Sequence, residues 1–224
     1  GRKIMKRNKM LSSSAMTILA VVFTILVKTV DVGYVANTGS AVGFYSVNMP
    51  FIEKFSFNAT LFSLTQVLGL VALLPVIFFA FLGLYELSTR KSLKKVDPDL
   101  YAMALLYVLM AAVYIFFDKV YVVNLRPIIM EGESVAASSF PSTHTLLSIT
   151  ILGSAIMECG RIKSKGGRVT LSLLLALLLL AVVAGRLFSG VHWPTDIIGG
   201  VLWGEVLLLW FQYFSLLFSE KIKG

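Results

Sequence analysis

Two histidines stand out in this sequence, because each lies among polar residues at the point where a long apolar run begins. His144 closes the stretch "SFPSTH", and His192 is followed four positions later by Asp196. An imidazole whose second ring nitrogen donates to a carboxylate is held in one tautomer and can act as a nucleophile. We therefore predict that His192 is a nucleophile oriented by Asp196, and that His144 is a general acid for the departing oxygen.

Three cations accompany the histidines. Lys119 and Arg126 occur in "KVYVVNLRP", and Arg186 occurs in "AGRLFSG". Pro141 and Pro194 predict that helices begin beside the two histidines, since proline is well tolerated in the first helical turn. Helix N-termini attract anions, and the planar guanidinium fork matches phosphate oxygens. The pattern predicts a phosphate site whose ligands are Lys119, Arg126 and Arg186.

The composition places this chemistry in a membrane. Of the 224 residues, 57% are hydrophobic and only 14% are charged, and the mean hydropathy is +0.84, outside the range of soluble domains. This length suffices for about six spans of roughly 20 residues, with little left for a soluble domain. We predict an all-α, polytopic membrane protein with six transmembrane helices, built as a single domain over residues 1–224.

Six apolar windows are the predicted spans, and the fourth is the shortest. They cover residues 11–30, 61–85, 100–117, 143–157, 169–188 and 197–218. The linker at residues 31–60 contains aromatic residues punctuated by glycines, which is typical of a segment that lies along the membrane interface. We expect this linker to cover the site.

The loops predict how the chain is oriented. Four basic segments fall on one side of a six-span scheme, at residues 2–9, 90–95, 161–168 and 221–223. Because basic loops are retained in the cytoplasm, we predict cytoplasmic N- and C-termini, an extracytoplasmic active site and a bacterial plasma membrane. The net charge of +8 resides in these loops, without a groove of interleaved aromatic and basic residues, so no nucleic-acid partner is expected. The single cysteine, Cys159, predicts no disulfide framework.

Three segments carry a recognisable pattern. They read Lys119-x6-Arg126-Pro127, Pro141-Ser142-Thr143-His144 and Arg186-x5-His192-x3-Asp196. In order and spacing they resemble the three-part signature of the type 2 phosphatidic acid phosphatase superfamily, integral membrane lipid phosphatase branch. The resemblance implies a metal-independent phosphatase with no cofactor, acting on a lipid phosphate or pyrophosphate through a phosphohistidine. It also implies that Ser142 and Thr143 contribute to phosphate binding.

Two positions depart from the family pattern. The family usually has glycine where this chain has Thr143, and serine where it has Gly185. A threonine keeps its backbone N–H but adds a branched side chain close to the phosphate, and Gly185 lacks a hydroxyl donor. Both departures concern substrate geometry more than reaction type.

Alternatives to a phosphatase remain at this stage. A lipid transporter, flippase or channel would use the intramembrane Glu205, for which Gln66 is one candidate partner. A metal-dependent hydrolase is less consistent with the sequence, because catalytic zinc needs three protein ligands and few histidines are present. Candidate substrates are isoprenyl pyrophosphate, phosphatidate and phosphatidylglycerol phosphate. The sequence does not specify an oligomeric state.

Overall fold

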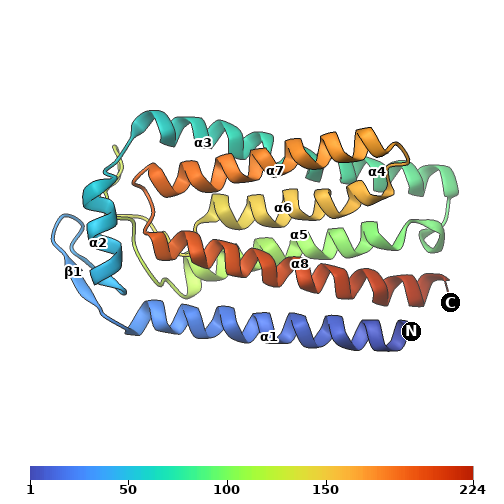
Figure 1. The fold of residues 1–224 in the computed structure, drawn as a ribbon, viewed down its shortest axis with the longest axis horizontal. Coiled ribbons are helices and arrows are strands. Elements are labelled where there is room, and N and C mark those ends of the chain that lie inside the picture. Colours follow the sequence, from blue (N-terminus) through green and yellow to red (C-terminus); the bar gives the residue numbers. More distant parts are fainter. Residues whose placement is uncertain (224) are drawn as a thin grey trace.

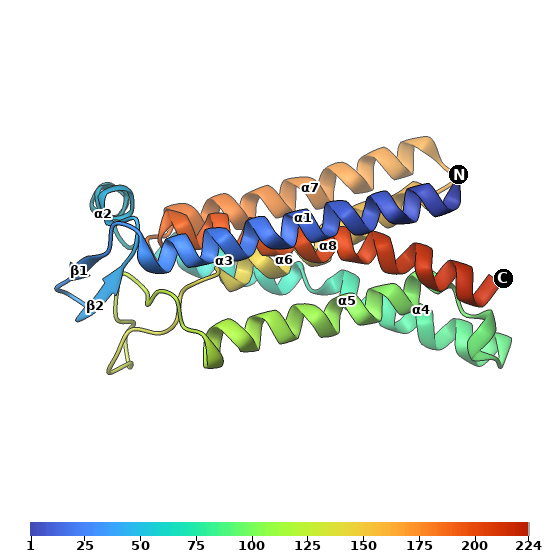
Figure 2. The same ribbon diagram turned by 90° about the horizontal axis from the view of Figure 1, so that it is seen from below.

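The computed structural model describes residues 1–223 as a bundle of long helices that run along one axis (Figure 1). The long helices are α1 (Arg2–Thr29), α3 (Ala59–Val71), α4 (Leu74–Arg90), α5 (Pro98–Ile115), α6 (Thr143–Glu158), α7 (Lys165–Phe188) and α8 (Pro194–Lys223). In two perpendicular views, α1 lies beside α8 (Figures 1 and 2), and α8 also packs on α5 and α6. Helix α7 lies between α6 and α3. The predicted helical architecture is therefore confirmed.

Within residues 1–223, five helical segments are long and apolar enough to cross a membrane, namely 2–29, 59–90, 98–120, 165–188 and 194–222. The second consists of α3 and α4, which are separated by a short turn at Ala72 and Leu73. The protein is thus an integral membrane protein, and the sixth predicted span, over α6, remains a prediction. Helix α6 has only 16 residues. It is nonetheless the most enclosed helix, because Leu146, Ile151 and Leu152 are fully buried against its neighbours.

The helix starts agree with the sequence in one case and not in the other. Pro194 is the first residue of α8, as predicted. Helix α6 starts at Thr143 with Ser142 as its N-cap, so Pro141 lies before the helix and not in its first turn. The prediction for Pro141 was wrong because the chain is still turning there: the backbone N–H of Ser142 bonds to the carbonyl of Asp196.

A small β-hairpin interrupts the all-α prediction. Strands β1 (Gly33–Val35) and β2 (Ser40–Val42) pair antiparallel, with Gly33 opposite Val42, and helix α2 (Tyr45–Lys54) follows. Val35 and Val42 bury their side chains against Trp193, directly after the second histidine. The linker therefore covers the site end of the bundle, as expected.

Asn48 joins the linker at residues 31–60 to the start of α8 by hydrogen bonds. The side chain of Asn48 is fully buried, and its amide donates to the carbonyl of Gly43 at 2.8 Å and to Oγ1 of Thr195 at 2.9 Å. A buried amide that lacks such partners is costly. The cover and the start of α8 are thus locked together beside His192.

Two glycines let α8 approach α6 closely. A Cβ atom on Gly200 would lie 2.8 Å from Cβ of Thr145, and one on Gly204 would lie 2.5 Å from Cγ2 of Ile149. Small residues spaced by four allow helix backbones to pack tightly in membranes. The Gly200-x3-Gly204 pattern therefore serves packing within the chain.

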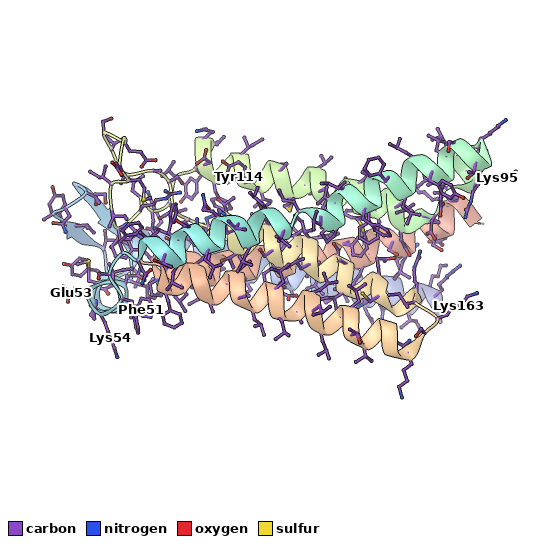
Figure 3. All side chains as sticks on the ribbon, turned by 90° about the horizontal axis from the view of Figure 1, so that it is seen from above. Phe51, Glu53, Lys54, Lys95, Tyr114 and Lys163 are labelled. Carbon is purple, nitrogen blue, oxygen red and sulfur yellow. The ribbon has the colours of Figure 1, made fainter. Side chains whose placement is uncertain are left out.

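The two ends of the bundle differ in character. Lys95 and Lys163 lie at the end where both chain termini are found, whereas Phe51, Glu53 and Lys54 of α2 lie at the opposite end (Figures 1 and 3). The basic loops that the sequence grouped together are thus at one end. The histidines are at the other, beside the hairpin and α2.

Candidate active site

His192 and Asp196 form a buried pair at the junction of α7 and α8. The carboxylate Oδ2 lies 3.6 Å from Nδ1 of His192, and the two side chains are 3% and 0% exposed. This separation is longer than an ordinary hydrogen bond. Because the i, i+4 spacing brings Nδ1 toward the carboxylate, the other ring nitrogen, Nε2, faces away from Asp196 and is available for chemistry.

The carboxylate of Asp196 is itself held from two sides. Its Oδ2 accepts a 3.0 Å hydrogen bond from the backbone N–H of Trp193, and its Oδ1 accepts one of 3.0 Å from the side-chain amide of Asn124. These two donors satisfy the buried carboxylate oxygens. Asp196 is therefore held in a fixed orientation beside the imidazole of His192.

Arg186 is almost completely buried, with 1% of its surface exposed. Its Nη1 donates a 3.1 Å hydrogen bond to Oγ1 of Thr65, and its guanidinium carbon lies 5.2 Å from the ring centre of Phe62. Its Nε has no hydrogen-bond partner among residues 1–223. A buried guanidinium without a carboxylate partner is costly unless an anion binds there, which is what a phosphate site provides.

Arg126 comes from the long loop between α5 and α6. Its backbone N–H bonds to the carbonyl of Ala137, beside a β-bridge between Leu125 and Ser138, so the loop folds back on itself. The charge of Arg126 acts on His144, Arg186 and His192. The two arginines and two histidines therefore lie within electrostatic range of one another, although they are up to 66 positions apart (126 to 192).

His144 lies at the side of this group and borders a cavity of about 210 Å³. The other lining residues belong to α3 and α6, and include Gln66, Gly69 and Ser148. A Cβ atom on Gly69 would lie only 2.6 Å from Cδ2 of His144, so α3 and α6 meet closely at this point. The cavity leads from His144 to Leu70, an exposed apolar residue of α3.

Lys119 is placed differently from the other predicted ligands. Its side chain is 76% exposed, and its Nζ lies 2.9 Å from Oδ2 of Asp118. Helix α5 ends in a π-helical turn at Phe116–Val120, which rotates the residues that follow relative to a regular α-helix. The structure does not bring Lys119 against the arginines or the histidines, and its binding role remains a prediction.

Ser142 and Thr143 lie at the start of α6, next to His144. Ser142 is fully buried, and its Oγ accepts a 3.1 Å hydrogen bond from Oγ1 of Thr145. The backbone N–H of Ser142 donates to the backbone carbonyl of Asp196. Thr143 borders a small cavity shared with Phe117 and Asp118. Thr143 thus lies on the side of α6 that faces the end of α5.

Burial dominates the acid–base behaviour of His192. Removal from water lowers the pKa of this imidazole below its ordinary value, the carboxylate of Asp196 opposes the shift, and the charges of Arg186 and Arg126 reinforce it. The ring is therefore neutral at neutral pH. A neutral imidazole has the free lone pair that a nucleophile needs.

Comparison with known families identifies the group to which these residues belong. The family profile described as PAP2 superfamily matches residues 100–218, more than half of the chain. The chain belongs to the PAP2 superfamily. All of the candidate residues named from the sequence, from Lys119 to Asp196, fall inside the matched part.

One solved PAP2-type structure has the same fold as this chain. A transmembrane PAP2-type phosphatidylglycerolphosphate phosphatase from Bacillus subtilis superimposes with a TM-score of 0.65 at 14% identity, covering 93% of this chain and 96% of that one. The LpxE protein of Aquifex aeolicus gives a TM-score of 0.44 at 22% identity, covering 74% and 93%. No curated protein matches at a significant level.

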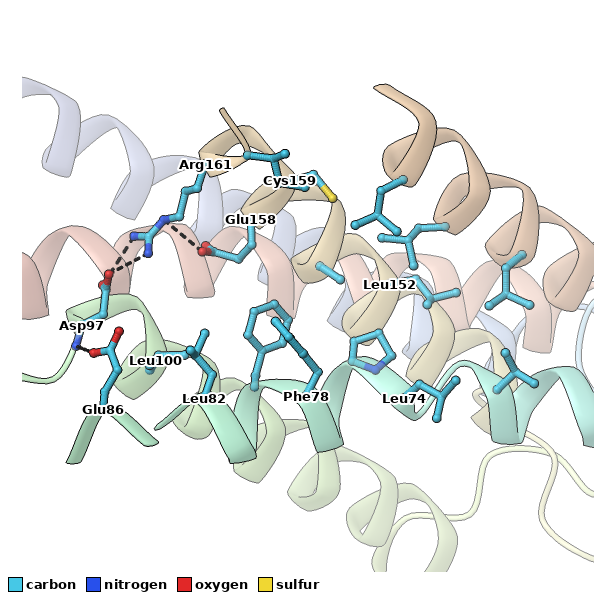
Figure 4. Close-up of a pocket in the computed structure, with 18 residues that line it drawn as sticks. Leu74, Phe78, Leu82, Glu86, Asp97, Leu100, Leu152, Glu158, Cys159 and Arg161 are labelled. Atoms are coloured by element: carbon cyan, nitrogen blue, oxygen red, sulfur yellow. Dashed lines mark hydrogen bonds and ion pairs between the residues drawn. The ribbon is translucent and has the colours of Figure 1, made fainter. Parts of the chain in front are cut away.

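A second cavity lies away from this PAP2 site, and Figure 4 shows it between α4, α6 and α7. Its volume is about 470 Å³, and its walls are mostly apolar. At its far end Arg161 forms ion pairs with Asp97, Asp99 and Glu158. Neither histidine borders it, so it is not the candidate catalytic pocket.

Sequence reasoning missed three residues that hold the PAP2 site together: Asn124, Thr65 and Phe62. Asn124 had a usable signal, because it lies two positions before Arg126 in the same loop. Thr65 and Phe62 gave none, since they belong to α3, outside the matched segment. Within residues 1–223 there is no group of three or more His, Cys, Asp or Glu side chains arranged to hold a metal.

Proposed function

We propose that this protein is a membrane lipid phosphatase that hydrolyses a lipid phosphate or pyrophosphate through a phosphohistidine on His192. The observation that carries the proposal is the buried pair of His192 and Asp196, within electrostatic range of Arg186, a buried guanidinium that has no carboxylate partner among residues 1–223. Membership of the PAP2 superfamily supports it. The fold shared with a phosphatidylglycerolphosphate phosphatase is consistent with it.

The first step forms the covalent intermediate. The lone pair on Nε2 of His192 attacks phosphorus while the bond from phosphorus to the lipid oxygen breaks. Nδ1 keeps its proton, which Asp196 stabilises as positive charge develops on the ring. His144 donates a proton to the departing lipid oxygen, and Arg126 and Arg186 stabilise the charge on the equatorial oxygens.

The second step releases the phosphate. A water molecule attacks phosphorus, the bond from phosphorus to Nε2 breaks, and His144 takes up the proton that the water loses. Inorganic phosphate leaves, and both histidines return to their starting protonation states. Each cycle consumes one water and breaks one bond, which is a phosphoester bond in a lipid phosphate and a phosphoanhydride bond in a lipid pyrophosphate. The products are one phosphate and one lipid, which is an alcohol in the first case and a monophosphate in the second.

The substrate class follows from the surroundings of the site. The cavity at His144 opens between α3 and α6, where exposed apolar residues such as Leu70 surround it, and such a path suits a headgroup whose tail stays in the bilayer. Isoprenyl pyrophosphate, phosphatidate and phosphatidylglycerol phosphate all fit this description. With the basic loops cytoplasmic, the site faces the extracytoplasmic leaflet of a bacterial plasma membrane.

The decisive experiment measures phosphate release by the purified protein in detergent micelles. We expect inorganic phosphate from at least one of these three lipid phosphates, in the presence of a chelator. His192→Ala should abolish release while the thermal unfolding of the protein stays cooperative. Absence of release from every member of the panel would contradict the proposal.

A lipid transporter or flippase is the alternative from a different class. It would move a labelled lipid between the leaflets of a reconstituted vesicle without releasing phosphate, and His192→Ala would leave that movement unchanged. The buried His192–Asp196 pair favours the hydrolase, because lipid translocation does not require a carboxylate and an arginine beside an imidazole.

A further inference from the structure

We propose that Thr65 of α3 is a positioning residue for Arg186, and that Gly185 is the complementary half of this contact. The proposal rests on the proposed phosphatase function, in that it explains how the phosphate-binding guanidinium is held. Neither the three signature segments nor the matched profile, which begins at residue 100, includes Thr65.

The hydrogen bonds of Thr65 have a fixed direction. Its hydroxyl donates to the carbonyl of Phe62 at 2.8 Å, so the proton is committed within α3. The lone pair of the same oxygen accepts the 3.1 Å bond from Nη1 of Arg186. The order of donors therefore runs from Arg186 to Thr65 to Phe62, which leaves no freedom in how the hydroxyl receives the guanidinium.

Phe62 restrains the same guanidinium from its flat side. The guanidinium carbon of Arg186 lies 5.2 Å from the centre of the Phe62 ring, within the range of a cation–π contact. Phe62, Thr65 and Gly69 are spaced by three and four residues and lie on one face of α3. This face contacts Arg186 through its first two residues and His144 through Gly69. One side of α3 thus positions both a phosphate ligand and the proposed general acid.

The absence of a side chain at Gly185 allows Thr65 of α3 to lie close to the backbone of α7. A Cβ atom at position 185 would lie 2.4 Å from Cγ2 of Thr65, a distance that real Cβ contacts do not reach. The branched side chain of threonine has few rotamers in a helix. Moving Cγ2 away would therefore also move Oγ1 away from Arg186. The hydroxyl on α3 and the missing side chain on α7 are two parts of one arrangement.

The first test changes the hydroxyl alone. Thr65→Val keeps the shape of the side chain but removes the acceptor, and we expect kcat/KM for lipid phosphate hydrolysis to fall about tenfold or more. The stabilisation of the protein against heat by inorganic phosphate should weaken in parallel. Thr65→Ser, which keeps the hydroxyl, should stay within about threefold of the wild type. Thr60→Val, an exposed change on the same helix, is the matched control and should have no effect.

The second test uses the steric contact. Gly185→Ala should impair hydrolysis and phosphate stabilisation, because its Cβ meets Cγ2 of Thr65. The double variant Thr65→Ser with Gly185→Ala should recover both properties, because serine lacks Cγ2 and keeps the hydroxyl. Gly83→Ala, whose Cβ meets no other atom within 4 Å, is the control for the added methyl group.

The outcomes separate this inference from the proposed function. If Thr65→Val behaves as the wild type does, or if the double variant is no better than Gly185→Ala, the positioning role is wrong although the phosphatase stands. If the wild type releases no phosphate from any lipid, the proposed function fails. In that case, loss of phosphate stabilisation in Thr65→Val and in Gly185→Ala, with recovery in the double variant, would still establish that Thr65 positions the anion-binding Arg186.

Discussion

The side-chain amide of Asn124 donates a 3.0 Å hydrogen bond to Oδ1 of Asp196, joining the loop after α5 to the first turn of α8. Both side chains are buried, at 2% and 0% exposure. Removing one partner of a buried carboxylate leaves the charge without its donor, which costs about 1.5–3 kcal/mol. We expect Asn124→Leu to lower the free energy of unfolding by about 2 kcal/mol and kcat at least tenfold. Thermal unfolding and phosphate release measure these effects.

The matched control is Asn8→Leu, since Asn8 is exposed on α1 at the other end of the bundle. It should change neither quantity. A fully active Asn124→Leu protein would show that Asp196 needs no second donor.

Alanine substitutions of the two histidines should lower the reaction rate in different ways. His192→Ala removes the nucleophile, and we expect kcat to fall at least about 1,000-fold with no phosphoenzyme formed. His144→Ala removes the proton donor for the lipid oxygen, so a substrate with a good leaving group, such as p-nitrophenyl phosphate, should lose much less rate than a lipid phosphate. Comparing the two substrates on the two variants tests the division of roles. Equal losses on both substrates for His144→Ala would contradict a general acid.

The pH profile should reflect the burial of His192. Because burial lowers the pKa of this imidazole, the ring stays neutral as the pH falls past the value of about 6.5 for a free histidine. The acid limb of kcat/KM that belongs to His192 should therefore lie below pH 6.5. Arg126→Gln removes a charge that lowers this pKa, so it should move the limb to higher pH. A limb above pH 6.5 in the wild type would contradict the buried neutral ring.

The lowered pKa of His192 also makes the folding stability depend on pH. In the unfolded chain the imidazole takes up a proton below about pH 6.5, whereas in the folded protein it does so only at lower pH. The contribution of His192 to folding stability is therefore fully present above pH 6.5 and decreases as the pH falls toward its folded pKa. His192→Gln should reduce the pH dependence of the melting temperature between pH 7 and pH 5.

Replacing Lys119 and replacing Arg126 should have very different effects on kcat/KM. Lys119 is exposed and pairs with Asp118, whereas the charge of Arg126 acts on both histidines and on Arg186. We expect Lys119→Gln to keep kcat/KM within about threefold and Arg126→Gln to lose about 100-fold or more. Steady-state phosphate release on a single lipid substrate distinguishes them. A large loss in Lys119→Gln would show that the lysine turns inward when substrate binds.

Alanine substitutions at two glycines, Gly204 at the close contact of α8 with α6 and Gly83 on α4, should have opposite effects on stability. Gly204→Ala places a Cβ 2.5 Å from Cγ2 of Ile149, and such overpacking destabilises by about 1–3 kcal/mol. Gly83→Ala meets no other atom within 4 Å and should stabilise its helix by up to about 1 kcal/mol. Melting temperatures in one detergent compare the two directly. A neutral Gly204→Ala would mean that the two helices separate at this point.

The sequence predicted the fold well where apolar periodicity is strong. All six apolar windows are helical, and Pro194 begins α8 as expected. The hairpin escaped prediction, because its strands have three residues each and depend on packing against Trp193. The start of α6 was misplaced for a similar reason, since the backbone N–H of Ser142 bonds to the carbonyl of Asp196, a long-range contact that local preference does not reveal.

The site was predicted in part. His192, Asp196, His144 and the two arginines converge, because their sequence spacing follows the ends of the helices that carry them. Lys119 does not join them, since a π-helical turn is invisible to a search based on a period of 3.6 residues. The contribution of α3 was missed altogether, because Thr65 is an ordinary membrane-helix threonine until the fold places Arg186 against it.

The cavity beside His144 has a consequence for how the protein is assayed. Since it opens between α3 and α6, we expect a lipid headgroup to reach His144 from the plane of the micelle or bilayer and not from bulk water. The rate should then follow the mole fraction of substrate among the amphiphiles, so that adding empty micelles dilutes the substrate without changing its bulk concentration. Kinetic measurements on this protein should therefore vary the mole fraction of substrate in the micelle or bilayer, and not only its bulk concentration.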